Sequence, residues 1–356
     1  GTFSVPLRRT SIKRDNIFNI ISAKPPTQMN SIGVDQDGTD FSYFSSFKFG
    51  SSEEEYHLLI DSAASNSWVM GSECINSACE AHNTFGEGDS DTLTITNAPF
   101  EIVYGTGSVS GRYAEDTAHF AGFSTPMIFG LASNVSSDFL RYPMDGILAL
   151  ARPDTLTSGD IHPTVIDSLR ESNLISNKVF GIHLSRHADG ENDGELNFGA
   201  PNQDRYDNDL TYIPAITDDR GFWQIALDAA GVDGTMLHLP SRTIILDTGT
   251  SFILTPHEDA ASLHSLIPFS TSDGETFKIP CRSTQTVHFV LGGRTFNISH
   301  LDYVGRSDGL EGDMCYSNII GRTTFGDAQW LVGDVFFKNV YTIFDYDEAR
   351  IGLGVK

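Results

Sequence analysis

Two stretches of this chain place an aspartate directly after a buried apolar run, and they constrain the fold more than any other feature. Leu58-Leu59-Ile60 precede Asp61-Ser62-Ala63-Ala64-Ser65, and Ile244-Ile245-Leu246 precede Asp247-Thr248-Gly249-Thr250-Ser251. An apolar run that ends in small residues is typical of a buried strand entering a tight turn. A buried carboxylate is costly unless a neighbouring group stabilises it, so each aspartate predicts a partner.

The length and charge of the chain limit its class. A chain of 356 residues predicts two lobes, each with its own core. Its 47 acidic and 23 basic side chains give a formal net charge of -24, which repels nucleic acid and anionic membranes, so we expect neither as a partner. Protonation would relieve this self-repulsion and favours an acidic working environment, although a soluble acidic protein at neutral pH has the same composition.

The cysteines and sequons indicate the secretory pathway. Four cysteines occur without Cys-x-x-Cys or clustered His spacing, so we expect two disulfides rather than a metal site. The sequons at Asn134 and Asn297 predict N-glycosylation. No stretch approaches the roughly 20 apolar residues of a membrane span, and the N-terminus lacks a signal-peptide core. We therefore expect a secreted, vacuolar or lysosomal protein whose numbering starts after a removed signal.

Residues 1 to 30 form a basic segment at the start of an acidic chain. Arg8, Arg9, Lys13 and Arg14 lie in it. Such a segment is a candidate prosegment that covers a negative cleft at neutral pH and leaves it on acidification, while a solvated tail is the alternative.

The rest of the chain predicts a mostly β protein. Residues 100 to 104 alternate at period two before Gly105-Thr106-Gly107-Ser108, which indicates a hairpin with a glycine tip. A dinucleotide-binding motif is excluded there because Gly111 is one residue too far on and no helix pattern follows. Helices are expected over residues 162 to 175 and 259 to 266.

An Asn- and Asp-rich stretch at residues 201 to 209 predicts the boundary between an N-terminal lobe, 31 to 203, and a C-terminal lobe, 204 to 356. Each half holds one aspartate turn, one pair of cysteines and one apolar signature with glycine, at 145 to 150 or 330 to 335. The halves are therefore predicted to be diverged copies of one unit.

From about Tyr43 onward the chain resembles the pepsin-like aspartic endopeptidases, whose active-site turns read Asp-Thr/Ser-Gly-Ser/Thr. The matching motifs are Asp247-Thr248-Gly249-Thr250-Ser251, Tyr104-Gly105-Thr106-Gly107-Ser108, Phe222-Trp223-Gln224-Ile225, Asp145-Gly146-Ile147-Leu148, Leu331-Val332-Gly333-Asp334-Val335-Phe336 and Phe344-Asp345-Tyr346. The acids are 186 residues apart (247 minus 61), near the family spacing. The resemblance implies a bilobal acid protease fold with two β-rich lobes around a central cleft. It also supports disulfides Cys74–Cys79 and Cys281–Cys315.

The same resemblance implies an aspartic endopeptidase in which Asp61 and Asp247 activate a water molecule under acidic conditions. Two carboxylates about a hydrogen bond apart cannot both ionise, so they share one proton. One acid then acts as a base toward water while the other donates to the scissile carbonyl. Peptide or protein substrates, no cofactor, no metal and a monomer are expected.

Ten residues are implied to bind substrate: Ser62, Ala63, Trp68, Tyr104, Gly105, Thr106, Ile147, Phe222, Gly249 and Thr250. Tyr104 would close over the substrate and exclude water, with Trp68 placed to hydrogen-bond it. Core packing is the alternative role for Trp68 and Ile147. For Tyr104 the alternative is a hairpin-stabilising aromatic.

The N-terminal half departs from the family pattern at three alanines. Ala63 and Ala149 replace glycines, and Ala64 replaces a serine whose hydroxyl would favour ionised Asp61. Ala63 keeps its N–H contact if the local φ suits an L-residue. Loss of the hydroxyl should raise the effective pKa of the acid pair, so we expect an active protease with an optimum shifted toward weaker acid.

Two other functions are compatible with a pair of aspartates in this chain. The first is a catalytically weakened pepsin-like fold that binds peptides or proteins, because of Ala63 and Ala64. The second, a carbohydrate hydrolase that uses Asp61 and Asp247, lacks an aromatic platform for sugars and is set aside.

Overall fold

The computed structural model describes residues 16–153, 162–207, 209–217, 219–309 and 313–356. Arg8, Arg9, Lys13 and Arg14 lie outside these ranges, so their predicted position over the cleft is untested. The described part of the N-terminal segment packs on the N-terminal half, where Asn16 Nδ2 donates to Asp145 Oδ1 at 3.0 Å.

The described residues are mostly β-strand and form five sheets, as the sequence predicts. The eight-stranded sheet, in spatial order, contains β2 (Asp35–Gln36), β3 (Tyr43–Phe49), β4 (Tyr56–Asp61), β9 (Gly146–Ala149), β5 (Trp68–Met70), β8 (Phe123–Val135), β7 (Gly107–Phe120) and β6 (Thr94–Tyr104). It carries Asp61 and the glycine-tipped hairpin of β6 and β7, whose tip Tyr104–Ser108 we call the flap.

The C-terminal half supplies three smaller sheets. The five-stranded sheet contains β13 (Gln224–Leu227), β16 (Arg242–Leu246), β25 (Gln329–Val332), β17 (Ile253–Thr255) and β24 (Ile319–Gly321). One four-stranded sheet contains β15 (Thr235–Met236), β14 (Ala229–Val232), β20 (Val287–Leu291) and β21 (Arg294–Ile298); the other contains β18 (Thr271–Asp273), β19 (Thr276–Pro280), β23 (Met314–Ser317) and β22 (Val304–Ser307). Asp247 follows β16 directly.

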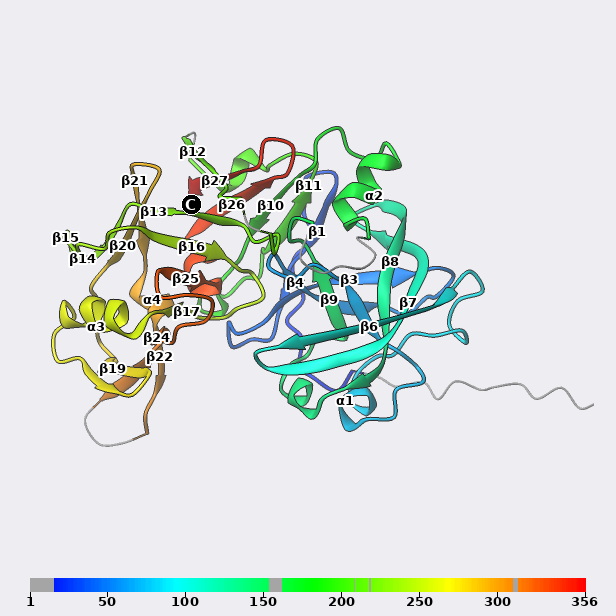
Figure 1. Ribbon diagram of the computed structural model, residues 1–356, viewed down its shortest axis with the longest axis horizontal. Helices are drawn as coiled ribbons and strands as arrows, with labels where there is room; N and C mark the ends of the chain where they lie inside the picture. The colour runs from blue at the N-terminus through cyan, green and yellow to red at the C-terminus, as the bar shows by residue number, and fades with distance from the viewer. Residues whose placement is uncertain (1–15, 154–161, 208, 218, 310–312) are drawn as a thin grey trace, which may run out of the picture.

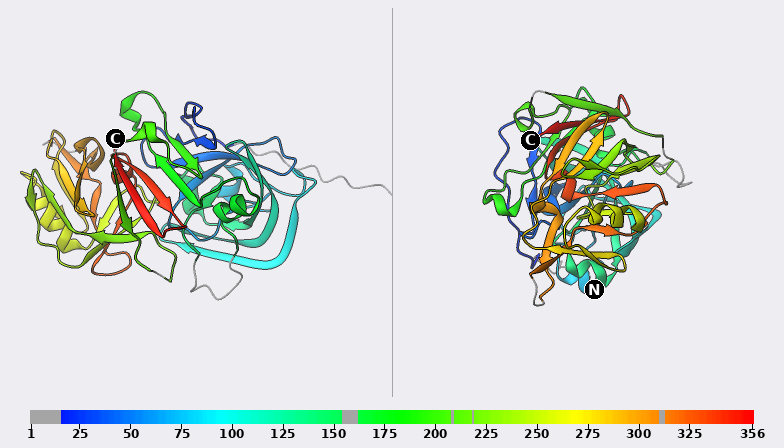
Figure 2. Two further views of the ribbon diagram at one scale, coloured as in Figure 1. Left: turned by 90° about the horizontal axis from the view of Figure 1, so that it is seen from above. Right: turned by 90° about the vertical axis from the view of Figure 1, so that its left-hand side faces the viewer.

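A six-stranded sheet joins the two halves. It contains β1 (Ser31–Gly33), β11 (Glu195–Phe198), β10 (Val179–His183), β26 (Val340–Asp345), β27 (Arg350–Val355) and β12 (Leu210–Pro214). Figure 1 shows these strands between the remaining strands of the C-terminal half on the left and those of the N-terminal half on the right, and Figure 2 shows the same arrangement from above. The lobe boundary at residues 203 and 204 stays a prediction.

The two halves repeat one pairing scheme around their aspartates. In the first half, β4 pairs parallel with β9, and β5 pairs antiparallel with β9. In the second, β16 pairs parallel with β25, and β17 pairs antiparallel with β25. Both apolar signatures found in the sequence supply the partner strand, β9 or β25. The repeat predicted from the aspartate turns is therefore present in the backbone.

The helices are short. They are α1 (Ser77–Glu80), α2 (Val165–Glu171), α3 (His257–Ser265), α4 (His300–Tyr303) and α5 (Asp334–Phe337), with 3₁₀ turns η1 (Ser137–Arg141), η2 (His187–Asp189) and η3 (Gln203–Arg205). The helix predicted over residues 162 to 175 is too long at both ends. Thr164 caps its start by accepting from the Asp167 N–H, and Asn173 adopts a left-handed φ of 57° just beyond its end. The helix predicted over residues 259 to 266 is confirmed as α3, which begins two residues earlier.

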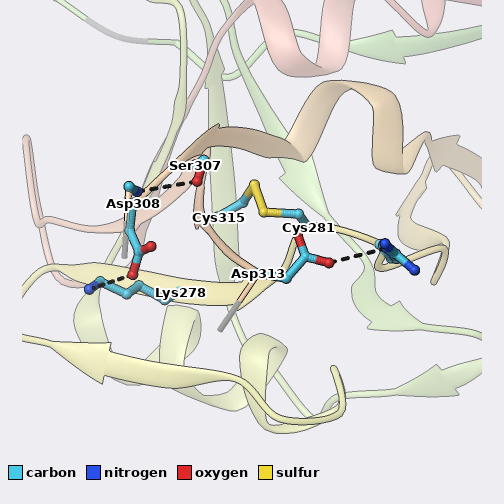
Figure 3. The surroundings of a disulfide bond; sticks show 8 residues. Lys278, Cys281, Ser307, Asp308, Asp313 and Cys315 are labelled. Carbon is cyan, nitrogen blue, oxygen red and sulfur yellow. Dashed lines mark hydrogen bonds and ion pairs between the residues drawn. A yellow bond between two sulfur atoms is a disulfide. The ribbon is translucent and has the colours of Figure 1, made fainter. Parts of the chain in front are cut away.

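Both predicted disulfides are confirmed. Cys74 bonds to Cys79, and Cys281 bonds to Cys315. Figure 3 shows the second bond, which links the residue after β19 to β23, with the Lys278–Asp308 ion pair at 3.1 Å nearby. Among the described residues, no helix is long and apolar enough to cross a membrane.

Candidate active site

The two aspartate turns are tied together by reciprocal hydrogen bonds from one half to the other. The Ser62 N–H donates to Thr248 Oγ1 at 3.0 Å, and the Thr248 N–H donates to Ser62 Oγ at 3.0 Å. Each hydroxyl then donates to a strand carbonyl of the other half, Ser62 to Leu246 at 2.8 Å and Thr248 to Ile60 at 2.7 Å. All these groups are buried, so the turns are fixed relative to one another.

The glycine of the second turn brings its backbone against the first acid. A methyl group on Gly249 would lie 2.6 Å from Cγ and Oδ2 of Asp61, which is closer than any real contact. The Asp61 carboxyl therefore faces the backbone two residues beyond Asp247. A side chain at position 249 is excluded by this contact.

The two carboxylates receive different donors. Asp61 Oδ1 accepts from the backbone N–H groups of Ala63 and Ala64, both at 2.9 Å. Asp247 Oδ1 accepts from the Gly249 N–H at 2.8 Å, and its Oδ2 accepts from the Thr250 hydroxyl at 2.6 Å. Position 64 is the place in the first turn that corresponds to Thr250. Because it is alanine, that turn supplies no hydroxyl there.

Burial and mutual repulsion keep protons on this pair. Asp61 is 8% exposed and Asp247 is 7% exposed. Burial, followed by the negative charge of Asp247, raises the pKa of Asp61 to about 8, against the lowering effect of the two N–H donors. Burial also raises the pKa of Asp247, opposed by the Thr250 hydroxyl and the Gly249 N–H. The pair therefore holds a shared proton well above the ordinary carboxyl range.

None of the three unusual alanines lies in the left-handed φ region, so an L-residue fits each position without that backbone strain. Ala63 and Ala64 keep their N–H donors to Asp61. The Ala149 N–H donates to the Ser67 hydroxyl at 2.9 Å. The first turn thus keeps both backbone N–H donors to its aspartate, and it differs from the family pattern in the methyl group of Ala63 and in the missing hydroxyl at position 64.

The flap tyrosine, Tyr104, is hydrogen-bonded by Trp68, as the family resemblance implies. Trp68 Nε1 donates to the Tyr104 hydroxyl at 2.8 Å. Phe139 of η1 lies edge-on to both rings, with centroid separations of 5.4 Å to Trp68 and 6.2 Å to Tyr104. Gly105 and Thr106 are exposed at the flap turn. Phe139 was not predicted, because no apolar period in its local sequence relates it to Trp68 or Tyr104.

Ile147 and Phe222 pack in two different apolar clusters. Ile147 is 2% exposed and pairs with Trp68 across β5 and β9, so core packing is its observed environment. Phe222 packs in a small cluster with Ala63, and its ring centroid lies 4.8 Å from that of Phe325, with the two rings tilted by 55°. Phe325 is 42% exposed. Phe325 was not predicted, because nothing in its local sequence relates it to Phe222.

A third buried carboxyl, Asp334, lies close enough to be affected by the charge of Asp247. Asp334, at the start of α5, is buried, and within the described residues its Oδ1 has no hydrogen-bond partner. Burial raises the pKa of Asp334 well above its ordinary value, against the opposing charge of Lys338, and Asp247 raises it further. Asp334 stands within an apolar run, Leu331 to Phe336, and this pattern indicates a buried acid. The sequence motif that contains Asp334 did not by itself predict its proximity to Asp247.

No group of three or more potential metal ligands occurs among the described residues. Two β-rich halves that each present an aspartate turn to one shared site, beside a β-hairpin with a tyrosine at its tip, define a pepsin-like aspartic endopeptidase. Comparison with known families agrees: the eukaryotic aspartyl protease family matches residues 42–356, and the chain belongs to that family.

Curated relatives are similar over most of the chain. A probable aspartic-type endopeptidase CTSD of Trichophyton verrucosum is 42% identical over 359 residues, covering 100% of this chain and 69% of the relative. The aspartic-type endopeptidase ctsD of Aspergillus fumigatus is 40% identical over 353 residues, covering 99% of this chain and 73% of the relative. Pepsin A of Sus scrofa is 34% identical over 324 residues, covering 88% and 81%. These relatives support the enzyme and give the non-catalytic alternative no support.

The missing hydroxyl at position 64 gives a testable pH shift. In Ala64→Ser, a new donor to ionised Asp61 should lower the pKa of that carboxyl, so the pH profile of kcat/KM should move to lower pH by roughly 0.5 to 1 unit. Thr250→Ala removes the matching donor from Asp247 and should move the profile to higher pH. Unchanged profiles in both variants would show that these hydroxyls do not set the ionisation of the pair.

Loss of the Trp68–Tyr104 hydrogen bond should lower activity without unfolding the protein. Tyr104→Phe leaves the Trp68 N–H without its acceptor and should lower kcat/KM roughly tenfold, equivalent to about 1.4 kcal/mol. Because Trp68 is buried, its unpaired N–H should also lower Tm, by about a few degrees for a chain of this size. Kinetics on a short peptide, with Tyr113→Phe as a control on the same sheet, measure this effect. Equal kinetics for wild type and Tyr104→Phe would remove the tyrosine from the mechanism.

Proposed function

We propose that Asp61 and Asp247 hydrolyse peptide bonds by activating one water molecule between them under acidic conditions. The observation that carries this proposal is the pair itself: two buried carboxyls, supplied by two related turns, held together by the Ser62–Thr248 bonds. The ionised member takes a proton from water while the protonated member donates to the scissile carbonyl. The N–H groups after each acid hold the carboxylates in position, and no covalent intermediate is needed.

The different hydrogen-bond donors to the two carboxylates support a different role for each acid at the start of the reaction. Asp247 accepts from a hydroxyl as well as an N–H, while Asp61 accepts from N–H groups alone and lies against Gly249. Ionised Asp247 is therefore the better stabilised anion, and Asp61 carries the shared proton. This supports an optimum shifted toward weaker acid.

Substrate binding is proposed for the residues that surround this pair. Tyr104, Gly105 and Thr106 of the flap would cover an extended peptide, with Trp68 fixing the tyrosine. Phe222 offers an apolar surface beside Ala63, and the backbone of Gly249 and Thr250 offers hydrogen bonds. Ser62 acts by holding the turns, and Ile147 acts by packing beneath Trp68. Peptides or proteins with apolar side chains near the scissile bond are the proposed substrates.

The setting of the enzyme is also a proposal. Two disulfides and the exposed asparagines of both sequons support a glycoprotein of the secretory pathway, secreted or delivered to a vacuole or lysosome. A monomer is proposed as well. We keep the lobe division at residues 203 and 204 and residues 1 to 30 as a candidate prosegment. N-terminal sequencing after incubation at low pH tests the prosegment, and an intact terminus with full activity would eliminate it.

Digestion of acid-denatured haemoglobin or casein between about pH 3 and 6 tests the proposed activity. We expect discrete fragments with new termini between apolar residues. Binding of the same peptides without any fragment, across the whole pH range, would instead support the catalytically weakened alternative.

A further inference from the structure

The sequon at Asn134 lies on the strand that borders the flap hairpin. It ends β8, which pairs with β7, and the register places Asn134 opposite Ser110 and Val135 opposite Val109. The serine of the sequon contacts the flap directly: Ser136 Oγ accepts from the Ser108 N–H at 3.1 Å, and the Ser136 N–H donates to the Ser108 carbonyl at 2.9 Å. Any group attached to this sequon is therefore close to the flap.

The pleat of the sheet fixes which face Asn134 occupies. Val109 and Val135 are buried in the apolar cluster that contains Trp68 and Phe139. Because neighbouring side chains of a strand point to opposite faces, Asn134 and Ser110 point away from that cluster. Asn134 is exposed.

The outer face continues to the flap tip. In the same register Ser110 lies opposite Glu101, and Ser108 lies opposite Val103. Val103 is 77% exposed, although valine in a strand is usually covered. Three residues separate Ser110 from Gly107, which is roughly 10 Å along a strand. Asn134 thus lies on the same outer face of the hairpin as the exposed Val103, with β7 between their strands.

We propose that Asn134 carries an N-linked glycan that lies over the outer face of the flap hairpin and hinders large protein substrates more than short peptides. A bulky, hydrated glycan at this point does not enter the inner face, where Tyr104 covers an extended peptide. A large substrate extends beyond the cleft and meets the glycan. This inference rests on the proposed peptidase activity.

The other sequon supplies a matched control. Asn297 is also exposed on a strand, but it lies on β21 of the C-terminal half, opposite His288 of β20. That sheet contains no flap strand. A glycan there would add the same mass and polarity without bordering the flap.

The experiment uses the full chain from a eukaryotic host that adds N-glycans, with Asn134→Gln and Asn297→Gln as single variants. Mass spectrometry of glycopeptides measures glycan occupancy at each asparagine. Kinetics on a short fluorogenic peptide and on intact casein measure the access of small and large substrates to the site. We expect occupancy at Asn134, and a casein kcat/KM about threefold or more higher in Asn134→Gln with peptide kcat/KM unchanged. Asn297→Gln should leave both unchanged, and enzymatic deglycosylation of the wild type should reproduce the Asn134→Gln result.

Several results would overturn the proposal. An unmodified Asn134 would show that no glycan is attached there. An equal change in casein kcat/KM for Asn134→Gln and Asn297→Gln would show that a glycan at Asn134 has no particular effect on access to the site. Wild-type protein that cleaves neither substrate would refute the peptidase activity and with it the shielding effect, while glycopeptide mass would still report the modification by itself.

Discussion

Asp247→Asn should lower kcat for peptide hydrolysis by roughly 10³-fold or more, because an amide cannot take a proton from water. The substitution is close to isosteric. Its side-chain oxygen can still accept from the Gly249 N–H or from the Thr250 hydroxyl, which contact Asp247 at 2.8 and 2.6 Å. The fold should therefore survive, with a thermal unfolding curve close to that of the wild type.

The control for this variant is the same substitution at an exposed aspartate, which changes size and charge equally. Asp91→Asn also removes one carboxylate, but it lies on the surface of the N-terminal half. It should retain wild-type kinetics. If Asp247→Asn keeps more than about a tenth of the wild-type kcat while folded, Asp247 is not the base of the reaction.

Gly249→Ala should lower kcat by about 10²-fold or more, because a methyl group at this position would press on the Asp61 carboxyl at 2.6 Å. Either the second turn or Asp61 must move, and a displacement of about 1 Å within a catalytic pair typically costs that much.

The paired control is the reverse exchange, alanine to glycine, at the matching position of the first aspartate turn. Ala63→Gly restores the glycine of the family pattern, and Ala63 already has an ordinary φ. Its N–H should continue to donate to Asp61, so activity should stay within about threefold of the wild type. Similar losses in Gly249→Ala and Ala63→Gly would show that the effect comes from backbone flexibility rather than from contact with Asp61.

The sequence predicted the features that local pattern controls. The two apolar runs ending in aspartate predicted the strands β4 and β16, and period-two alternation predicted the flap hairpin. The Ser62 and Thr248 hydroxyls were expected to link the turns only because of the family resemblance. Their reciprocal bonds join residues 186 positions apart, which no local pattern reveals.

The remaining differences between the sequence-based prediction and the structure have physical causes that a local sequence pattern does not contain. Helix α2 is shorter than its apolar period suggests, because the Thr164 cap and left-handed Asn173 set its ends. The six-stranded sheet pairs β10 with β26. Their paired residues lie 160 to 166 positions apart in the chain (342 minus 182 and 345 minus 179), so local periodicity could not predict this pairing. Phe325 and Phe139 join the site through contacts made only after folding.

The pH dependence of kcat/KM on a short peptide tests the central claim most directly, because it counts the protons on the acid pair. Burial and the charge of Asp247 raise the pKa of Asp61 to about 8, and burial raises that of Asp247. A bell-shaped profile is therefore expected, with one limb for the first ionisation of the pair and a second limb, toward neutral pH, for loss of the shared proton. A profile with a single limb, or one with its acidic limb at the position usual for pepsin-like enzymes, would contradict a proton shared by Asp61 and Asp247 under the control of the altered first turn.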